Sequence, residues 1–115
     1  MGFVSSGRRY RPSMTDLPAD ALRVVATIPI DPAQASEAAA ALATLAAATL
    51  KEEEGCYAYD VFESTMVPGT FVTVEAWRSQ ADMDAHMGTP HIGKAFEVLG
   101  PAIAGDIAIH PLKAV

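Results

Sequence analysis

The sequence is poor in cysteine, which stabilises secreted proteins through disulfides, and in the basic residues that contact nucleic acids. Its 115 residues contain a single cysteine, Cys56, which excludes an internal disulfide and favours a reducing cytoplasm. Lys and Arg together number 8 against 14 Asp and Glu, and the net charge of −6 argues against a nucleic-acid partner. No apolar run approaches the roughly 20 residues needed to cross a bilayer, so we expect no membrane association.

Motifs that hold cofactors are also missing. The chain has no Gly-rich phosphate loop, no Cys/His metal cluster and no G-x-S-x-G nucleophile elbow. His86 and His91 have no third ligand at a suitable local spacing, so a metal site is not expected. We therefore expect a protein that uses neither a metal nor an organic cofactor.

The size of the chain, 12.1 kDa, leaves room for one domain. Residues 1–20 are interpreted as a flexible N-terminal arm, because residues 1–16 carry three arginines and are rich in Gly, Ser and Pro. Residues 21–115 are then expected to form the folded domain.

Hydrophobic patterning beyond the arm predicts alternating strands and helices. Asp31 before a proline, with Gln34 three residues on, is typical of a helix start, and Gly55 is typical of a helix end. Ser79 and Thr89 are expected to cap two shorter helices. The expected elements are a strand at 22–28, a helix from 31 to about 54, strands at 56–63 and 71–77, a helix at 79–87, a helix from 90 and a strand at 107–112.

This β-α-β-β-α-β order indicates an α+β fold of the ferredoxin-like type, in which a four-stranded antiparallel sheet carries its helices on one face. In the strand at 71–77, Phe71 and Trp77 point to one face while Val72 and Val74 point to the other. Both faces of the sheet therefore need cover. We expect a homodimer in which two such sheets pack face to face.

Two ordered strings run through the second half of the chain. The first is E-E-G-C-x-x-Y, from Glu53 to Tyr59. The second is F-V-x-V-E-x-W-x-S-x-x-x-x-x-A-H-x-x-x-P-H-x-x-x-x-F, from Phe71 to Phe96. Together they resemble the antibiotic biosynthesis monooxygenase (ABM) domain, and the resemblance covers about residues 22 to 113.

The resemblance implies a dimeric α/β barrel with a pocket between sheet and helices in each subunit. Several relatives oxidise electron-rich aromatic polyketides, quinols or anthrones with O₂ and no cofactor, and others degrade haem. This chain departs from both groups, because they use a first-strand asparagine and the chain contains none; Ala26 or Thr27 occupies that neighbourhood. Where the haem degraders place a tryptophan and a histidine, the chain has His86 and Phe96, which disfavours the haem branch.

Oxidation without a cofactor requires a group that accepts the phenolic proton. His86, near the expected end of one helix, and His91, at the start of the next, are the candidate catalytic residues, because histidine titrates near neutrality. The alternative is that one caps the helix break and the other fills a packing gap. His110, on the last strand, is expected to be a surface or interface residue.

Four aromatic residues are candidate substrate contacts: Trp77, Tyr57, Tyr59 and Phe96. The two tyrosines are expected on one face of their strand, and packing is the alternative role for the group. Glu75 lies inside a strand and must be paired if it is buried, with Arg78 or a partner subunit as the expected source.

The sequence thus predicts a cytoplasmic homodimer that binds a small planar aromatic and oxidises it with O₂. The alternatives are a binding module that holds a small hydrophobic metabolite without chemistry, and a haem-degrading relative.

Overall fold

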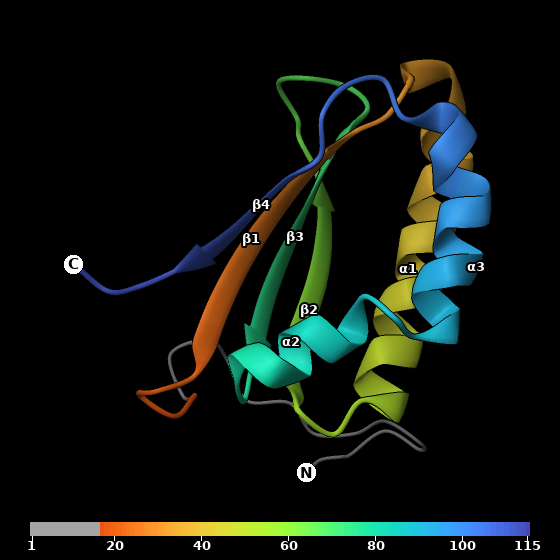
Figure 1. Cartoon of the computed structure of the whole chain (residues 1–115). Helices are drawn as coiled ribbons and strands as arrows, with labels where there is room; N and C mark the ends of the chain where they lie inside the picture. Colours follow the sequence, from red (N-terminus) through yellow and green to blue (C-terminus); the bar gives the residue numbers. More distant parts are fainter. Residues whose placement is uncertain (1–16) are drawn as a thin grey trace, which may run out of the picture.

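A computed structural model describes residues 17–115, which form one antiparallel sheet with helices on one face (Figure 1). The strand order is β2-β3-β1-β4. The elements are β1 (Leu22–Pro29), η2 (Pro32–Gln34), α1 (Ala35–Glu52), β2 (Cys56–Glu63), β3 (Thr70–Trp77), α2 (Gln80–His86), α3 (Pro90–Leu99), η3 (Gly100–Ala102) and β4 (Ala108–Leu112). The predicted ferredoxin-like α+β fold is confirmed, with α2 and α3 together making the second helical crossover.

The arm expected at residues 1–20 lies mostly outside the described residues. Of its described part, Leu17 is buried and packs with Ala21, Ala58 and Ala76 at the end of the sheet. The packed structure therefore already includes a residue that precedes residue 21.

The first crossover differs from the expected single helix. Asp31 does act as a cap, and its Oδ1 accepts a 3.0 Å hydrogen bond from the backbone N–H of Ala33. Gln34 makes no capping hydrogen bond, so its predicted part in the helix start is wrong, and the short η2 turn precedes α1. The buried face of α1 recurs every three or four residues, at Ala38, Leu42, Leu45 and Thr49.

The hairpin of β2 and β3 closes in a turn that contains Gly69. Gly69 has φ +87°, which favours glycine, and a side chain there would also collide with the carbonyl oxygen of Ile30. A bulge interrupts the pairing between Cys56 and Ala58, so two consecutive residues of β2 oppose one residue of β3. The bulge shifts the alternation of side chains along β2, so residues on either side of it that are two positions apart point to opposite faces of the sheet.

The second crossover is divided by two caps, both at predicted positions. The hydroxyl of Ser79 accepts a 3.1 Å hydrogen bond from the N–H of Asp82, which starts α2. The hydroxyl of Thr89 accepts from the N–H of Ile92 at 3.4 Å, which starts α3. His86 is consequently the last residue of α2, and His91 lies in the first turn of α3.

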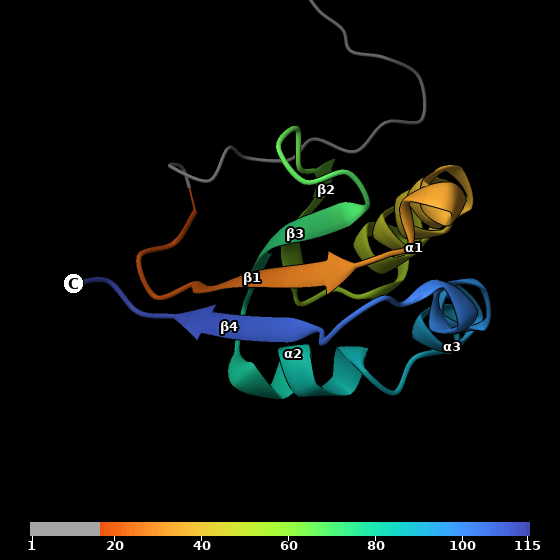
Figure 2. The same cartoon turned by 90° about the horizontal axis from the view of Figure 1, so that it is seen from above.

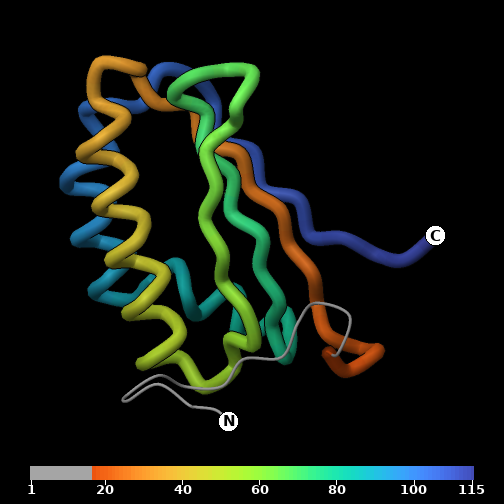
Figure 3. Tube along the Cα trace, turned by 180° about the vertical axis from the view of Figure 1, so that it is seen from behind, coloured from red at the N-terminus to blue at the C-terminus, as the bar shows by residue number. Residues whose placement is uncertain are grey.

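Among residues 17–115, no helix covers the other face of the sheet. Helices α1 and α3 pack side by side on one face, and α2 crosses one end of it (Figures 1 and 3). Strand β4 is an edge strand that pairs with β1, which explains why it tolerates Pro111 (Figure 2). On the uncovered face, Val72 and Val74 are half-buried and Phe62 is exposed.

Candidate functional site

Three side chains from separate elements converge where the helices end. Oε2 of Glu53, which follows α1, lies 2.6 Å from Nδ1 of His86 and 2.6 Å from Nε2 of His91. An ionised carboxylate can only accept hydrogen bonds. With Glu53 ionised, both imidazole nitrogens carry their protons, and the two rings donate to one oxygen.

The local fold fixes each member of this Glu53–His86–His91 cluster. The helix α1 ends at Glu52, and glycine follows at residue 55, where a side chain would collide with the carboxylate of Asp82 at the start of α2. The caps at Ser79 and Thr89 then set the ends of α2 and α3. Side-chain exposure rises outward through the cluster, from 4% at His86 to 12% at Glu53 and 14% at His91.

An aromatic wall surrounds the inner end of the cluster. The ring of His86 lies 4.9 Å from that of Trp77 and 5.4 Å from that of Tyr59, and these two aromatic rings meet edge to face. Burial, and then the charge of Glu75, raise the pKa of Tyr59 well above its ordinary range. The Tyr59 phenol therefore remains protonated at physiological pH.

The buried carboxylate of Glu75 orients this wall from β3. One of its oxygens accepts a 2.8 Å hydrogen bond from Nε1 of Trp77, and the other accepts a 2.6 Å bond from the hydroxyl of Thr73. The expectation that Arg78 pairs with Glu75 is wrong, because Arg78 forms two hydrogen bonds to Asp82 at 2.9 and 3.0 Å. Neutral donors on the same strand satisfy the buried charge instead.

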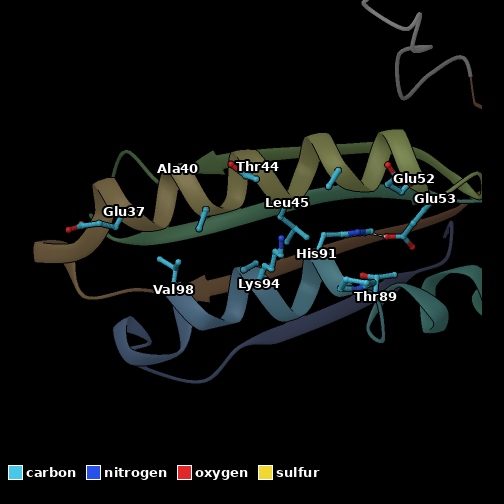
Figure 4. Close-up of a pocket in the computed structure, with 14 residues that line it drawn as sticks. Glu37, Ala40, Thr44, Leu45, Glu52, Glu53, Thr89, His91, Lys94 and Val98 are labelled. Carbon is cyan, nitrogen blue, oxygen red and sulfur yellow. Dashed lines mark hydrogen bonds and ion pairs between the residues drawn. The ribbon is translucent and has the colours of Figure 1, made fainter.

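Two cavities border the cluster. An inner cavity of about 50 Å³ lies between sheet and helices, and Tyr59, Glu75, His86 and Phe96 help to line it. A groove of about 900 Å³ runs between α1 and α3 (Figure 4). Only the groove falls in the range of roughly 300–1,000 Å³ that small-molecule sites occupy.

The groove has apolar walls and a polar end. Alanines of α1 and Val98 of α3 form its sides, and Lys94 lies along α3 (Figure 4). At one end, His91 and Glu53 point toward each other from the two helices. The cluster is therefore the polar boundary between groove and inner cavity.

The structure brings most of the sequence-predicted site residues together. His86, Trp77, Tyr59 and Phe96 belong to one buried region, and His91 joins it through Glu53. Tyr57 does not belong to this region.

Tyr57 packs instead against the small cluster of Leu17, Ala21, Ala58 and Ala76. The expectation that Tyr57 and Tyr59 share a face is wrong because of the bulge before Ala58. His110 is exposed on β4, as expected.

Sequence reasoning missed Glu53 as a functional residue. The separation of 33 residues from His86 and 38 from His91 gives no local spacing to detect. The premise that the histidines lack a third ligand was therefore too narrow, since Glu53 provides one from another element. The available signal was its place at the start of the string E-E-G-C, two residues before Gly55, where the helix was expected to end.

In the part of the chain that the structure describes, no helix is long and apolar enough to cross a membrane.

The sequence matches the family model "Antibiotic biosynthesis monooxygenase" over residues 21–98. It is 36% identical over 67 residues to the Escherichia coli K12 protein named "Probable quinol monooxygenase YgiN". That alignment covers 51% of this chain and 61% of the relative, so the match spans about three fifths of the relative's length.

Solved structures show the same fold. A Caulobacter crescentus CB15 protein, described in the same terms as the family model, is 33% identical, with a TM-score of 0.77 over 83% of this chain and 90% of that one. Rv0793 of Mycobacterium tuberculosis is 28% identical, with a TM-score of 0.73 over 84% of this chain and 96% of that one. Because the family model spans most of the domain and includes Glu53 and both clustered histidines, the chain belongs to the antibiotic biosynthesis monooxygenase family.

Proposed function

We propose that this protein is a monooxygenase that oxidises an electron-rich aromatic, such as a quinol, an anthrone or a polyketide phenol, with O₂ and without a cofactor. Membership of the family and the similarity to a protein named as a quinol monooxygenase support this class of activity. The observation that carries the proposal is the Glu53–His86–His91 cluster at the end of a ligand-sized groove.

The aromatic ring lies in the groove rather than in the inner cavity. The inner cavity, at about 50 Å³, has room for one or two molecules of the size of water and none for an aromatic ring. The groove has the volume, and its alanine-rich walls suit a flat apolar molecule. We therefore place Trp77, Tyr59 and Phe96 behind the imidazole of His86, where they position it, and not against the substrate.

His91 is the group that meets the substrate hydroxyl. Its Nε2 is held by Glu53, so its Nδ1 is the nitrogen that accepts the phenolic proton. Glu53 stabilises the imidazolium that results, and the N–H of His86 shares the charge of the carboxylate. The substrate anion can then pass an electron to O₂. Oxidation of an anthrone CH₂ group by one O₂ yields a carbonyl and one water, so no external reductant is required.

A second copy of the chain is the proposed partner. The uncovered face of the sheet presents half-buried Val72 and Val74 and exposed Phe62, which face-to-face packing of two sheets would cover. Val74→Lys is expected to shift the protein from dimer to monomer in analytical ultracentrifugation. A monomeric wild-type protein would overturn this part of the proposal.

Oxygen uptake with a panel of hydroquinones and anthrones, between about pH 6 and 9, tests the activity. The wild type is expected to exceed the uncatalysed rate after treatment with a chelator, and His91→Ala is expected to lose that excess. His110→Ala is the matched control, because His110 is exposed on β4 away from the cluster. Saturable binding of these aromatics without turnover, and unchanged in His91→Ala, would instead support a binding module.

A further inference from the structure

We propose that Glu53, His86 and His91 form a binding site for a divalent transition-metal ion, with Zn²⁺ as the representative ion. The inference does not rest on the proposed oxidation, because it concerns only what these three side chains bind. Two imidazoles and one carboxylate form the ligand set that zinc takes in many catalytic sites.

The positions of the donor atoms suit a small ion. Oε2 of Glu53, Nδ1 of His86 and Nε2 of His91 all lie within 4.8 Å of one another. Tetrahedral zinc with bonds of about 2.0–2.2 Å separates its ligand atoms by about 3.4 Å. Binding would lengthen the two 2.6 Å contacts to Glu53 by less than about 1 Å and would set the two histidine nitrogens, now within 4.8 Å of each other, at about 3.4 Å, changes that side-chain torsions can provide.

With Glu53 ionised, the two imidazole protons lie between these atoms in the metal-free protein. Metal binding requires neutral histidine with a free lone pair and an ionised carboxylate. The ion thus replaces the protons that His86 and His91 donate to Glu53, and no other group has to move into the site.

The surroundings hold the ligands in place before the ion arrives. The ring of His86 is fixed between Trp77 and Tyr59, at centroid distances of 4.9 and 5.4 Å. His91 is fixed by the capped first turn of α3, and Glu53 by the end of α1. Preorganised ligands on three rigid elements lose little conformational entropy when they bind.

The site keeps an open position on the side of the groove. Glu53 and His91 line the groove (Figure 4), whereas His86 lines the inner cavity. Three protein ligands and one open position distinguish catalytic zinc sites from closed structural sites. An oxygen atom of a groove ligand could therefore occupy the fourth position.

Titration of tag-free, chelator-treated protein with Zn²⁺, followed by calorimetry and elemental analysis, tests the site. One ion per chain is expected. His91→Ala and Glu53→Gln are each expected to weaken binding by at least about 100-fold, which exceeds the usual loss from an outer-shell change. Neither variant removes a fully buried side chain, so both are expected to fold, and circular dichroism checks this.

His110→Ala is the matched control and is expected to bind like the wild type. A wild-type protein without stoichiometric zinc would overturn the proposal and leave a hydrogen-bonded cluster only. Equal zinc binding by His91→Ala, Glu53→Gln and the wild type would also overturn it, because the ion would then lie elsewhere.

The metal titration and the oxygen-uptake assay test the two proposals independently. Zinc binding without turnover would reject the monooxygenase proposal alone, and turnover without zinc binding would reject the metal site alone. If both hold, bound zinc is expected to suppress the oxidation, since an imidazole of His91 that binds the ion through Nε2 carries its proton on Nδ1 and no longer accepts the phenolic proton there. A chelator should then restore the rate.

Discussion

Nε1 of Trp77 donates a 2.8 Å hydrogen bond to Oε1 of Glu75, two residues earlier on the same strand. The second oxygen of Glu75 accepts from the hydroxyl of Thr73, so both hydrogen-bond donors to this buried carboxylate come from β3 itself. This arrangement holds the indole that packs against His86. It therefore links the stability of β3 to the geometry of the candidate site.

Replacing Glu75 tests that link. Glu75→Leu leaves the buried N–H of Trp77 and the hydroxyl of Thr73 without an acceptor, and each unsatisfied group costs about 1–3 kcal/mol. The free energy of unfolding, from urea titration, is expected to fall by about 2–6 kcal/mol. Glu75→Gln keeps a carbonyl oxygen for the indole and is expected to lose much less. Equal losses in the two variants would contradict the assigned role.

Gly69 and Gly93 provide a matched pair of glycine substitutions. Gly69→Ala places a side chain at φ +87° and against the carbonyl of Ile30, so a loss of more than about 1 kcal/mol is expected. Gly93 lies in α3 with open space around it, so Gly93→Ala should stabilise the protein by roughly 0.5–1 kcal/mol. Thermal unfolding measures both, and opposite signs are the expected result.

The Arg78–Asp82 pair predicts a small acid-sensitive contribution to stability. Hydrogen bonds from Arg78 and then Ser79 lower the pKa of Asp82 below its ordinary value of 3.8. The stabilising effect is therefore present above about pH 4 and is lost as the pH falls through the lowered pKa.

Asp82→Asn tests this contribution. The variant is expected to melt a few degrees below the wild type at pH 7, and this gap should close in acid. Asp106→Asn, which changes an exposed acidic residue, should show no such convergence. A gap that is the same at pH 7 and pH 3 would show that the charge of Asp82 is not its cause.

How far the sequence predicts the structure depends on the range of each interaction. Local signals placed the caps at Ser79 and Thr89, because a cap is decided by neighbouring residues. The bulge that separates Tyr57 from Tyr59 was not predictable, since a strand carries no local signal for one additional residue in its pairing. The position of the bulge depends on how β2 pairs with β3.

The candidate site shows the same limit. His86 and His91 were predicted because both flank a recognisable helix break. Glu53 was not, because it reaches them only through the packing of α1 beside α3. Burial also decided the partner of Glu75. Arg78 is close in sequence, but it lies near the surface and pairs with Asp82, while Thr73 and Trp77 share the buried face of β3.

Glu53→Gln separates the roles of charge and shape in the proposed oxidation. Glutamine preserves the size of the side chain and one carbonyl oxygen for the histidines, but it removes the negative charge that stabilises a protonated His91. General acid–base effects of this kind contribute about 100-fold to 10,000-fold, so kcat is expected to fall by about 100-fold. KM should change little, because the groove walls of α1 and α3 are intact. Oxygen uptake against substrate concentration gives both parameters. A rise in KM with unchanged kcat would show that Glu53 binds the substrate and takes no part in proton transfer.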